Sequence, residues 1–318
     1  MKLLYLFICI ISLISCNSRT SSSEKLPENQ NLTNSEQANT NIEQSYYVRQ
    51  GLRFYNNGDF VSAMSCYTSA INENVNDVDA FYERGMLHLE LNNFNEAIDD
   101  FNVLLRMQNI QQYQIENAWM NRAIAYKQLE NFSRAVEDFT TLITFTMDNL
   151  NRVRIMGYDE LVESYRIMLG FAYFQRGICH IELREYNYSI IDFTNAISFD
   201  DRNAEYYLKR GLVNMELENY DIALHDLLDS IIIDPNQYET LNNIGIIYME
   251  LMQNTNAIYF FTEAIKLNNS IARIYYNRGL AYARIGNLSS AIQDIELASR
   301  LAPNNLNYKE LLDYLYSL

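Results

Sequence analysis

From residue 44 onward, small and large apolar residues recur along the chain in a fixed order. A small residue is followed twelve positions later by alanine or serine, and four positions after that by a large apolar residue. Successive copies start 34, 38, 54, 34, 34 and 34 positions apart, and apolar side chains at helical spacing around each start predict packed helices in each copy. The seven copies are Gly51, Ala63 and Tyr67; Gly85, Ala97 and Phe101; Ala123, Ala135 and Phe139; Gly177, Ser189 and Phe193; Gly211, Ala223 and Leu227; Gly245, Ala257 and Phe261; Gly279, Ala291 and Ile295.

Bulky residues surround the small ones in each copy. If the leading small residue is numbered position 8, a large side chain, aromatic in all but one copy, stands at position 4. The small residues at positions 8 and 20 let the two helices approach, and the large residues at positions 4, 11 and 24 fill the space around that contact. One copy cannot bury both of its faces, so we expect neighbouring copies to stack. The position 4 residues are Tyr47, Phe81, Trp119, Tyr173, Tyr207, Leu241 and Tyr275.

The period and the order of residues resemble the tetratricopeptide repeat, a helix–turn–helix unit of 34 residues. The resemblance implies an all-α, right-handed solenoid of about seven repeats that binds other proteins, with no enzymatic activity, no metal and no cofactor. A terminal segment, residues 306–318, has apolar residues at helical spacing and predicts a capping helix. The repeats, numbered one to seven, are expected at residues 44–77, 78–111, 116–149, 170–203, 204–237, 238–271 and 272–305.

Two inserts interrupt the period. Four extra residues lie near 109–115, and twenty more lie at 150–169. In the longer insert Leu161, Tyr165 and Met168 have helical spacing, and Asp159 is a candidate N-cap. Two interpretations stay open, a lengthened helix or loop and an element that contacts a partner.

Arginine at position 7 and aspartate at position 23 occur together in five repeats. Repeat one has Gln50 and Cys66 at these positions, and repeat six has Ile244 and Phe260. Because each arginine has an aspartate in its own repeat, we favour an ion pair between the two helices over an arginine cluster that binds anions. The five pairs are Arg84 and Asp100, Arg122 and Asp138, Arg176 and Asp192, Arg210 and Asp226, and Arg278 and Asp294.

In this family the first helix of each repeat lines a concave groove through positions 2, 5, 6, 9, 12 and 13. Methionine and position 13 glutamate recur there, which favours a partner segment with apolar anchors and basic character. The alternative is that the methionines belong to the core. Position 9 is aliphatic or methionine, so the Lys and Asn clamp that binds Hsp70 or Hsp90 tails is missing. The expected groove residues are Tyr82, Glu83, Met86, Glu90, Met120, Asn121, Lys127, Phe174, Gln175, Glu182, Lys209, Met215, Glu216, Asn242, Asn243, Met249, Glu250, Tyr276, Asn277 and Arg284.

The N-terminus resembles that of a bacterial lipoprotein. An apolar run at residues 3–15 follows Lys2 and is too short to span a bilayer, which needs roughly 20 residues. The run ends in Leu13, Ile14, Ser15 and Cys16, which is similar to a lipobox. We therefore expect a signal peptide at residues 1–15, lipidation of Cys16 and a flexible polar tether at residues 16–43; an ordinary secretory peptide is the alternative. This predicts an extracytoplasmic, lipid-anchored protein of the bacterial envelope, with Asn17 favouring the outer membrane.

Charge and chemistry narrow the function further. The formal charge of −16 argues against nucleic acid and against an anionic membrane surface. His88 and His180 share position 11 and are interpreted as packing residues, and no catalytic or metal-binding motif is present in the sequence. Cys66 and Cys179 lie three repeats apart, roughly 20 Å or more, so no disulfide is expected between them. The favoured function is a lipid-anchored interaction scaffold, and the rival is a structural protein that self-associates through its repeats.

Overall fold

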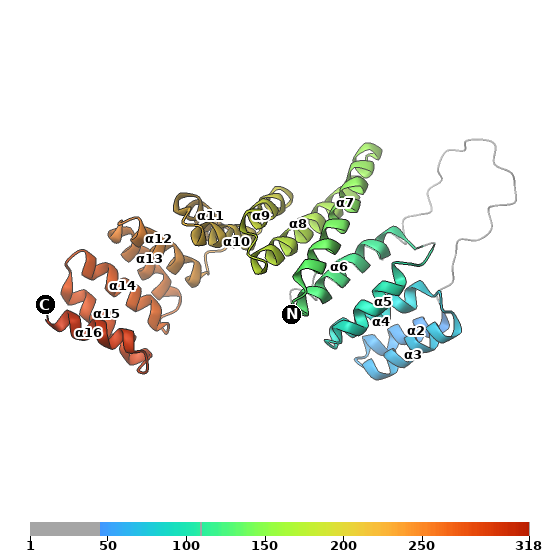
Figure 1. Cartoon of the computed structure of the whole chain (residues 1–318), viewed down its shortest axis with the longest axis horizontal. Coiled ribbons are helices and arrows are strands. Elements are labelled where there is room, and N and C mark those ends of the chain that lie inside the picture. The colour runs from blue at the N-terminus through green and yellow to red at the C-terminus, as the bar shows by residue number, and fades with distance from the viewer. Residues whose placement is uncertain (1–44, 109, 318) are drawn as a thin grey trace. The chain divides into compact units, whose positions relative to one another are not determined.

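In the computed structural model, residues 45–108 and 110–317 are described, and all their regular elements are α-helices (Figure 1). The helices alternate as antiparallel pairs, which confirms the expected all-α repeat fold. They fall into two compact units, one ending at Met168 and the other beginning at Leu169, and each is considered by itself. The expected signal peptide, the lipidation site at Cys16 and the tether lie outside the described residues.

Each expected repeat contains one helix pair. In the first unit the pairs are α2 (Tyr46–Asn56) with α3 (Phe60–Glu73), α4 (Val78–Glu90) with α5 (Phe94–Leu104), and α6 (Gln112–Gln128) with α7 (Phe132–Met156). The boundary between the units falls within α8 (Asp159–Glu182), which pairs with α9 (Tyr186–Phe199). The second unit continues with α10 (Ala204–Glu216), α11 (Tyr220–Ile233), α12 (Tyr238–Glu250), α13 (Asn254–Leu267), α14 (Ala272–Arg284), α15 (Leu288–Leu301) and α16 (Leu306–Ser317).

The two helices of a repeat meet at the small residue of position 8. A methyl group added at Gly245 would lie 2.5 Å from the ring of Phe261, and one at Gly177 would lie 2.7 Å from the ring of Phe193. Such contacts are shorter than carbon atoms tolerate, so the glycines permit the close approach. The position 24 side chains that fill this contact are 0–1% exposed: Tyr67, Phe101, Phe139, Phe193, Leu227, Phe261 and Ile295.

The turn between the helices of a repeat places position 15 in the left-handed region in every repeat. Glycine occupies it in two repeats, at Gly58 and Gly286, with φ of 77° and 78°. In the other five a side chain is held at φ between 57° and 61°, where L-residues are disfavoured. These five residues are Asn92, Glu130, Arg184, Glu218 and Met252.

Both inserts lengthen helices. The shorter insert adds to the start of α6, which has 17 residues against 13 in α4. The longer one extends α7 to 25 residues and α8 to 24, and the two helices are separated by Gly157 in the left-handed conformation and by Tyr158. Asp159 is the first residue of α8 and not its N-cap. Whether a partner contacts this extension stays a prediction.

The lengthened helices enclose a carboxylic acid. Glu116 on α6 is 2% exposed and accepts a hydrogen bond at 3.0 Å from the Nδ2 of Asn149 on α7. Gln112 on α6 also hydrogen-bonds Glu116, and its Nε2 lies 2.7 Å from the hydroxyl of Tyr165 on α8. Burial raises the pKa of Glu116 to about 7, although the two amide hydrogen bonds lower it. The carboxyl therefore titrates near neutral pH.

The capping helix α16 covers the last repeat. Tyr308 and Leu315 are 7% and 3% exposed and pack with the final helix pair. The ring of Tyr308 lies 4.8 Å from that of Tyr276, centroid to centroid. Tyr276, an expected groove residue, is thus partly covered by this helix.

Candidate functional site

The first helices of successive repeats lie side by side within each unit. In the first unit α2 contacts α4 and α4 contacts α6, and in the second unit α12 contacts α14. Their expected groove residues form hydrogen bonds across repeats: the Nδ2 of Asn121 donates to the Sδ of Met86 at 3.1 Å, and that of Asn277 donates to the Oδ1 of Asn242 at 3.0 Å. We call this surface, made by positions 5, 6, 9, 12 and 13 of the first helices, the first-helix surface.

A hollow of about 420 Å³ opens on this surface at the ends of α12 and α14. It is lined by Met249, Glu250, Met252, Asn254 and Arg284, so the fold brings three expected groove residues together. The Nη1 of Arg284 donates to the backbone oxygen of Met249 at 2.9 Å, which fixes the guanidinium beside the hollow. Met252 and Asn254 were not expected here. Met252 is 77% exposed and has a left-handed backbone, an uncommon place for a long apolar side chain.

Burial separates the expected groove residues into three groups. The methionines are less available than expected: Met249 is 6% exposed and belongs to a core cluster with Phe261, and Met86 and Met215 are half-buried against other clusters. The exposed side chains of the expected groove are therefore charged ones, and a role for the methionines in binding stays a prediction. Buried are Met120, Asn121, Phe174, Gln175, Asn242 and Met249; half-buried are Tyr82, Glu83, Met86, Glu90, Lys127, Lys209, Met215, Asn243, Tyr276 and Asn277; exposed are Glu182, Glu216, Glu250 and Arg284.

The five expected Arg–Asp pairs are confirmed, and each is bidentate. The Nε and Nη2 of the arginine donate to the two carboxylate oxygens of the aspartate at 2.6–2.9 Å in every pair. The aspartate side chains are only 2–9% exposed. Because the two residues stand on the first and second helix of one repeat, each pair holds that helix pair together.

The arginines also reach the preceding repeat, which the sequence pattern had not indicated. In repeats two, three, five and seven the Nη1 donates to an oxygen at position 25 of the preceding second helix. The acceptors are Thr68 at 3.4 Å, Asn102 at 2.7 Å, Thr194 at 2.9 Å and Thr262 at 3.0 Å. One guanidinium thus joins three helices.

Two histidines approach the aspartates of these pairs. The Nδ1 of His180 lies 2.6 Å from Glu185, and its Nε2 lies 3.6 Å from Asp192. The Nε2 of His88 lies 4.0 Å from Asp100, and burial lowers the pKa of this imidazole. The interpretation of these histidines as packing residues is incomplete, because position 11 follows position 7 by one helical turn and faces the same aspartate.

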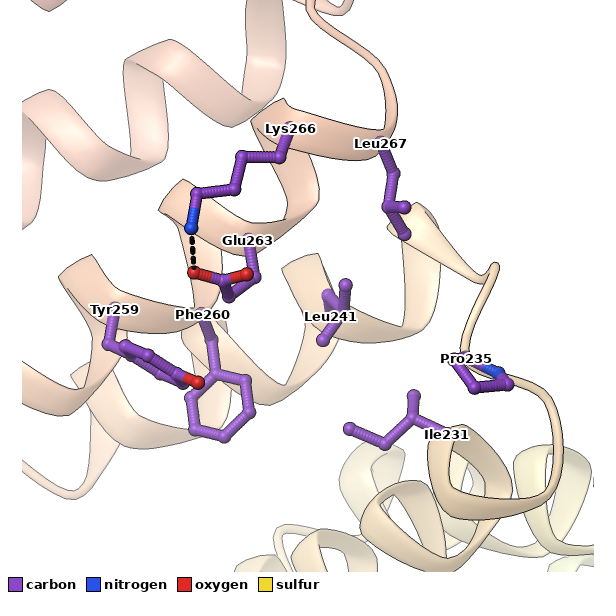
Figure 2. A pocket seen from close by; sticks show the side chains of 8 residues that line it. All are labelled: Ile231, Pro235, Leu241, Tyr259, Phe260, Glu263, Lys266 and Leu267. Carbon is purple, nitrogen blue, oxygen red and sulfur yellow. Dashed lines mark hydrogen bonds and ion pairs between the residues drawn. The ribbon is translucent and has the colours of Figure 1, made fainter.

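Repeat six replaces the polar cluster by apolar side chains. Ile244 and Phe260 stand in place of arginine and aspartate, and Leu228 stands at position 25 of the preceding repeat. These three side chains pack in one apolar cluster. Beside them lies a second hollow of about 410 Å³, lined by Ile231, Pro235, Leu241, Tyr259, Phe260, Glu263, Lys266 and Leu267 (Figure 2).

Among residues 45–108 and 110–317, no three His, Cys, Asp or Glu side chains gather as the ligands of a metal ion would. Of the helices in the described part of the chain, none combines the length and apolar character needed to cross a bilayer. Cys66 is half-buried, Cys179 is buried, and both are free thiols.

Comparison with known proteins agrees with this architecture. Models of the tetratricopeptide repeat match residues 48–110, 116–146, 238–271 and 272–305, about half of the chain. No curated protein sequence matches it.

Solved structures resemble it at low sequence identity. A tetratricopeptide repeat protein from Parabacteroides merdae is 19% identical, with a TM-score of 0.52 over 85% of this chain and 97% of that one. The C-terminal part of a repeat-containing protein from Cytophaga hutchinsonii is 11% identical, with a TM-score of 0.66 over 82% and 98%. MamA from Desulfovibrio magneticus is 14% identical, with a TM-score of 0.50 over 61% and 96%. With its repeat motif, helix pairs and matching family models, the chain belongs to the tetratricopeptide-repeat family.

Proposed function

We propose that the chain is a lipid-anchored adaptor of the bacterial cell envelope that binds a segment of another protein on its first-helix surface. Residues 1–15 would serve as the signal peptide, Cys16 as the acylated residue and residues 16–43 as the tether. Acyl chains contribute about 0.8 kcal/mol per buried methylene, so several chains on one cysteine give lasting attachment, here to the outer membrane.

The observation that carries the binding proposal is the hollow at the ends of α12 and α14. It combines an exposed apolar side chain, Met252, with an exposed carboxylate, Glu250, and with Arg284, which is held by the backbone of Met249. An apolar anchor with charged neighbours is the usual composition of a protein-binding patch. At this turn position the other six repeats carry glycine or a polar side chain, so the exposed apolar side chain of Met252 supports a functional reason for its presence.

Charge favours a basic partner. Position 13 carries glutamate in four repeats, Glu90, Glu182, Glu216 and Glu250, and the whole chain has a formal charge of −16. Such carboxylates attract and select a positively charged segment, whereas contact with apolar side chains supplies most of the affinity. The proposed partner segment therefore has an apolar anchor flanked by Lys or Arg.

The binding proposal is tested by quantitative affinity capture from cells that make the protein. Glu250→Gln with Met252→Ser changes only exposed side chains, and Asp221→Asn on α11 is the matched control for a lost surface charge. We expect the double variant to recover at least tenfold less of one specific protein, while Asp221→Asn recovers it normally. Equal recovery by all three proteins would contradict binding at this hollow.

The anchor is tested separately, because it can fail without affecting the binding proposal. Cys16→Ser should abolish incorporation of labelled palmitate and move the protein from the membrane fraction to the soluble fraction. If the wild-type protein takes up no palmitate, or the variant stays with membranes, the anchoring proposal is wrong.

A further inference from the structure

Repeat six differs from the other repeats at several positions that meet in space. In repeats three and four, aromatic side chains at positions 4 and 30 pack together: the rings of Trp119 and Phe145 are 5.3 Å apart, and those of Tyr173 and Phe199 are 5.9 Å apart. In repeat six both positions are leucine, Leu241 and Leu267. The ring that the other repeats supply at position 4 is therefore missing.

The space left by the missing ring is open to the surface. The hollow of about 410 Å³ has Leu241 at its centre, side chains of α13 on one side and Ile231 with Pro235 on the other (Figure 2). Its apolar lining reaches the surface, because Tyr259 is 59% exposed and Leu267 is 44% exposed. The hollow lies between α11 and α13, the second helices of repeats five and six, over Leu241 at position 4 of α12. It shares no lining residue with the hollow on the first-helix surface, which positions 5, 6, 9, 12 and 13 form.

The surroundings of this hollow are acidic. Of the seven carboxylates in residues 220–267, Asp226 is paired with Arg210 and Glu250 lines the other hollow, which leaves five. The single basic side chain in this range other than histidine is Lys266. The Nζ of Lys266 donates to the Oε1 of Glu263 at 2.6 Å, so this positive charge is already matched at the rim. A ligand with positive charge complements this face, whereas an acidic ligand is repelled.

We propose that the hollow beside Leu241 binds an aromatic side chain of a partner protein, within a segment flanked by Lys or Arg. The ring takes the place that an intramolecular aromatic side chain occupies in the neighbouring repeats, packing against Phe260 and Leu267. Aromatic contacts of this kind contribute beyond the area they bury. This second docking surface goes beyond the proposed binding on the first-helix surface and does not depend on it.

The test uses the full chain in phosphatidylcholine vesicles and a photoreactive peptide, acetyl-Lys-Lys-X-Lys-Lys-amide, in which X is p-benzoylphenylalanine. Two competitors replace X by Trp, one with the same lysine flanks and one with glutamate flanks. Leu241→Tyr fills the hollow with the residue that repeats four, five and seven carry at position 4, so the variant retains the repeat pattern. Glu137→Gln, which removes an exposed carboxylate of α7 away from both hollows' lining residues, is the control variant.

We expect the photoreactive peptide to label residues 231–241 and 259–267, the two segments that line this hollow, whereas residues 249–254 line the hollow on the first-helix surface. The lysine-flanked Trp peptide should compete at least tenfold better than the glutamate-flanked one. Leu241→Tyr should reduce labelling at least tenfold with its melting temperature maintained or raised, and Glu137→Gln should leave labelling unchanged. Undiminished labelling of folded Leu241→Tyr overturns the proposal. So does labelling confined to residues outside 231–241 and 259–267, or crosslinking of the hollow to a second copy or to lipid in place of the peptide.

Discussion

Removing the arginine of one Arg–Asp pair should destabilise the protein far more than replacing the whole polar cluster by apolar side chains. The pair of Arg210 and Asp226 is suited to the test, because the Asp226 side chain is 2% exposed and Thr194 is the third partner. Arg210→Ile alone leaves a buried carboxylate without its two hydrogen bonds of 2.9 and 2.7 Å from the guanidinium. Breaking a buried pair in this way costs about 3–5 kcal/mol of unfolding free energy.

The combined change Arg210→Ile, Asp226→Phe and Thr194→Leu reproduces the residues that repeat six and its predecessor carry naturally. It removes the charges together with their desolvation penalty, so we expect a loss below about 1–2 kcal/mol. Thr194→Leu alone is the control, since it leaves the bidentate pair intact.

Urea unfolding of each variant, followed by circular dichroism, measures these differences as shifts of the midpoint at constant slope. The single arginine variant should unfold at clearly lower urea than the triple variant. Equal losses for the two variants would refute the argument that the cost comes from the unpaired carboxylate.

Three further predictions concern the remaining features of the fold. Because burial raises the pKa of Glu116 from 4.5 to about 7, the folded protein keeps a proton that the unfolded chain loses. The contribution of this group to the unfolding free energy is therefore full below pH 4.5, and it decreases by about 3 kcal/mol as the pH rises through 7. Glu116→Gln should flatten this dependence of the unfolding free energy on pH, measured by urea unfolding at a series of pH values. Replacing Met252 or Glu218 by glycine relieves the left-handed backbone and should stabilise each variant by about 0.5–1 kcal/mol, but only Met252→Gly should weaken partner binding in affinity capture. Met249→Asp places a charge at a position that is 6% exposed and should lower the unfolding free energy by about 3–5 kcal/mol. An unchanged melting temperature would show that Met249 is not a core residue and would favour its assignment to the binding surface.

The sequence pattern was sufficient for the fold and for the Arg–Asp pairs, because both depend on side chains that repeat at fixed spacing. The contact of Gly245 with Phe261 and the pair of Arg210 with Asp226 recur at the same positions of other repeats, so one geometry explains each copy that carries these residues. The third partner of the arginines was missed because position 25 carries Thr, Asn or Leu, and only the packing of successive repeats shows that it faces position 7.

Features that occur once could not be found from periodicity. Glu116 lies in an ordinary helical pattern, and its burial results from the lengthened helices of the two inserts. The methionines of the expected groove are partly core residues, because adjacent first helices pack closely enough to cover side chains such as Met249. Met252 was outside the family positions, although an apolar residue at the left-handed turn position was a signal in the sequence.

The most direct test of the central claim, that the chain binds another protein on its first-helix surface, is site-specific photocrosslinking in living cells. A photoreactive amino acid replaces Glu250 beside the hollow in one protein and exposed Asp221 on α11 in the control. We predict that the Glu250 probe crosslinks to one other protein, through a segment with an apolar anchor and flanking Lys or Arg, and that the Asp221 probe does not. Crosslinks from Glu250 only to further copies of this chain would contradict the adaptor function and favour a self-associating structural protein.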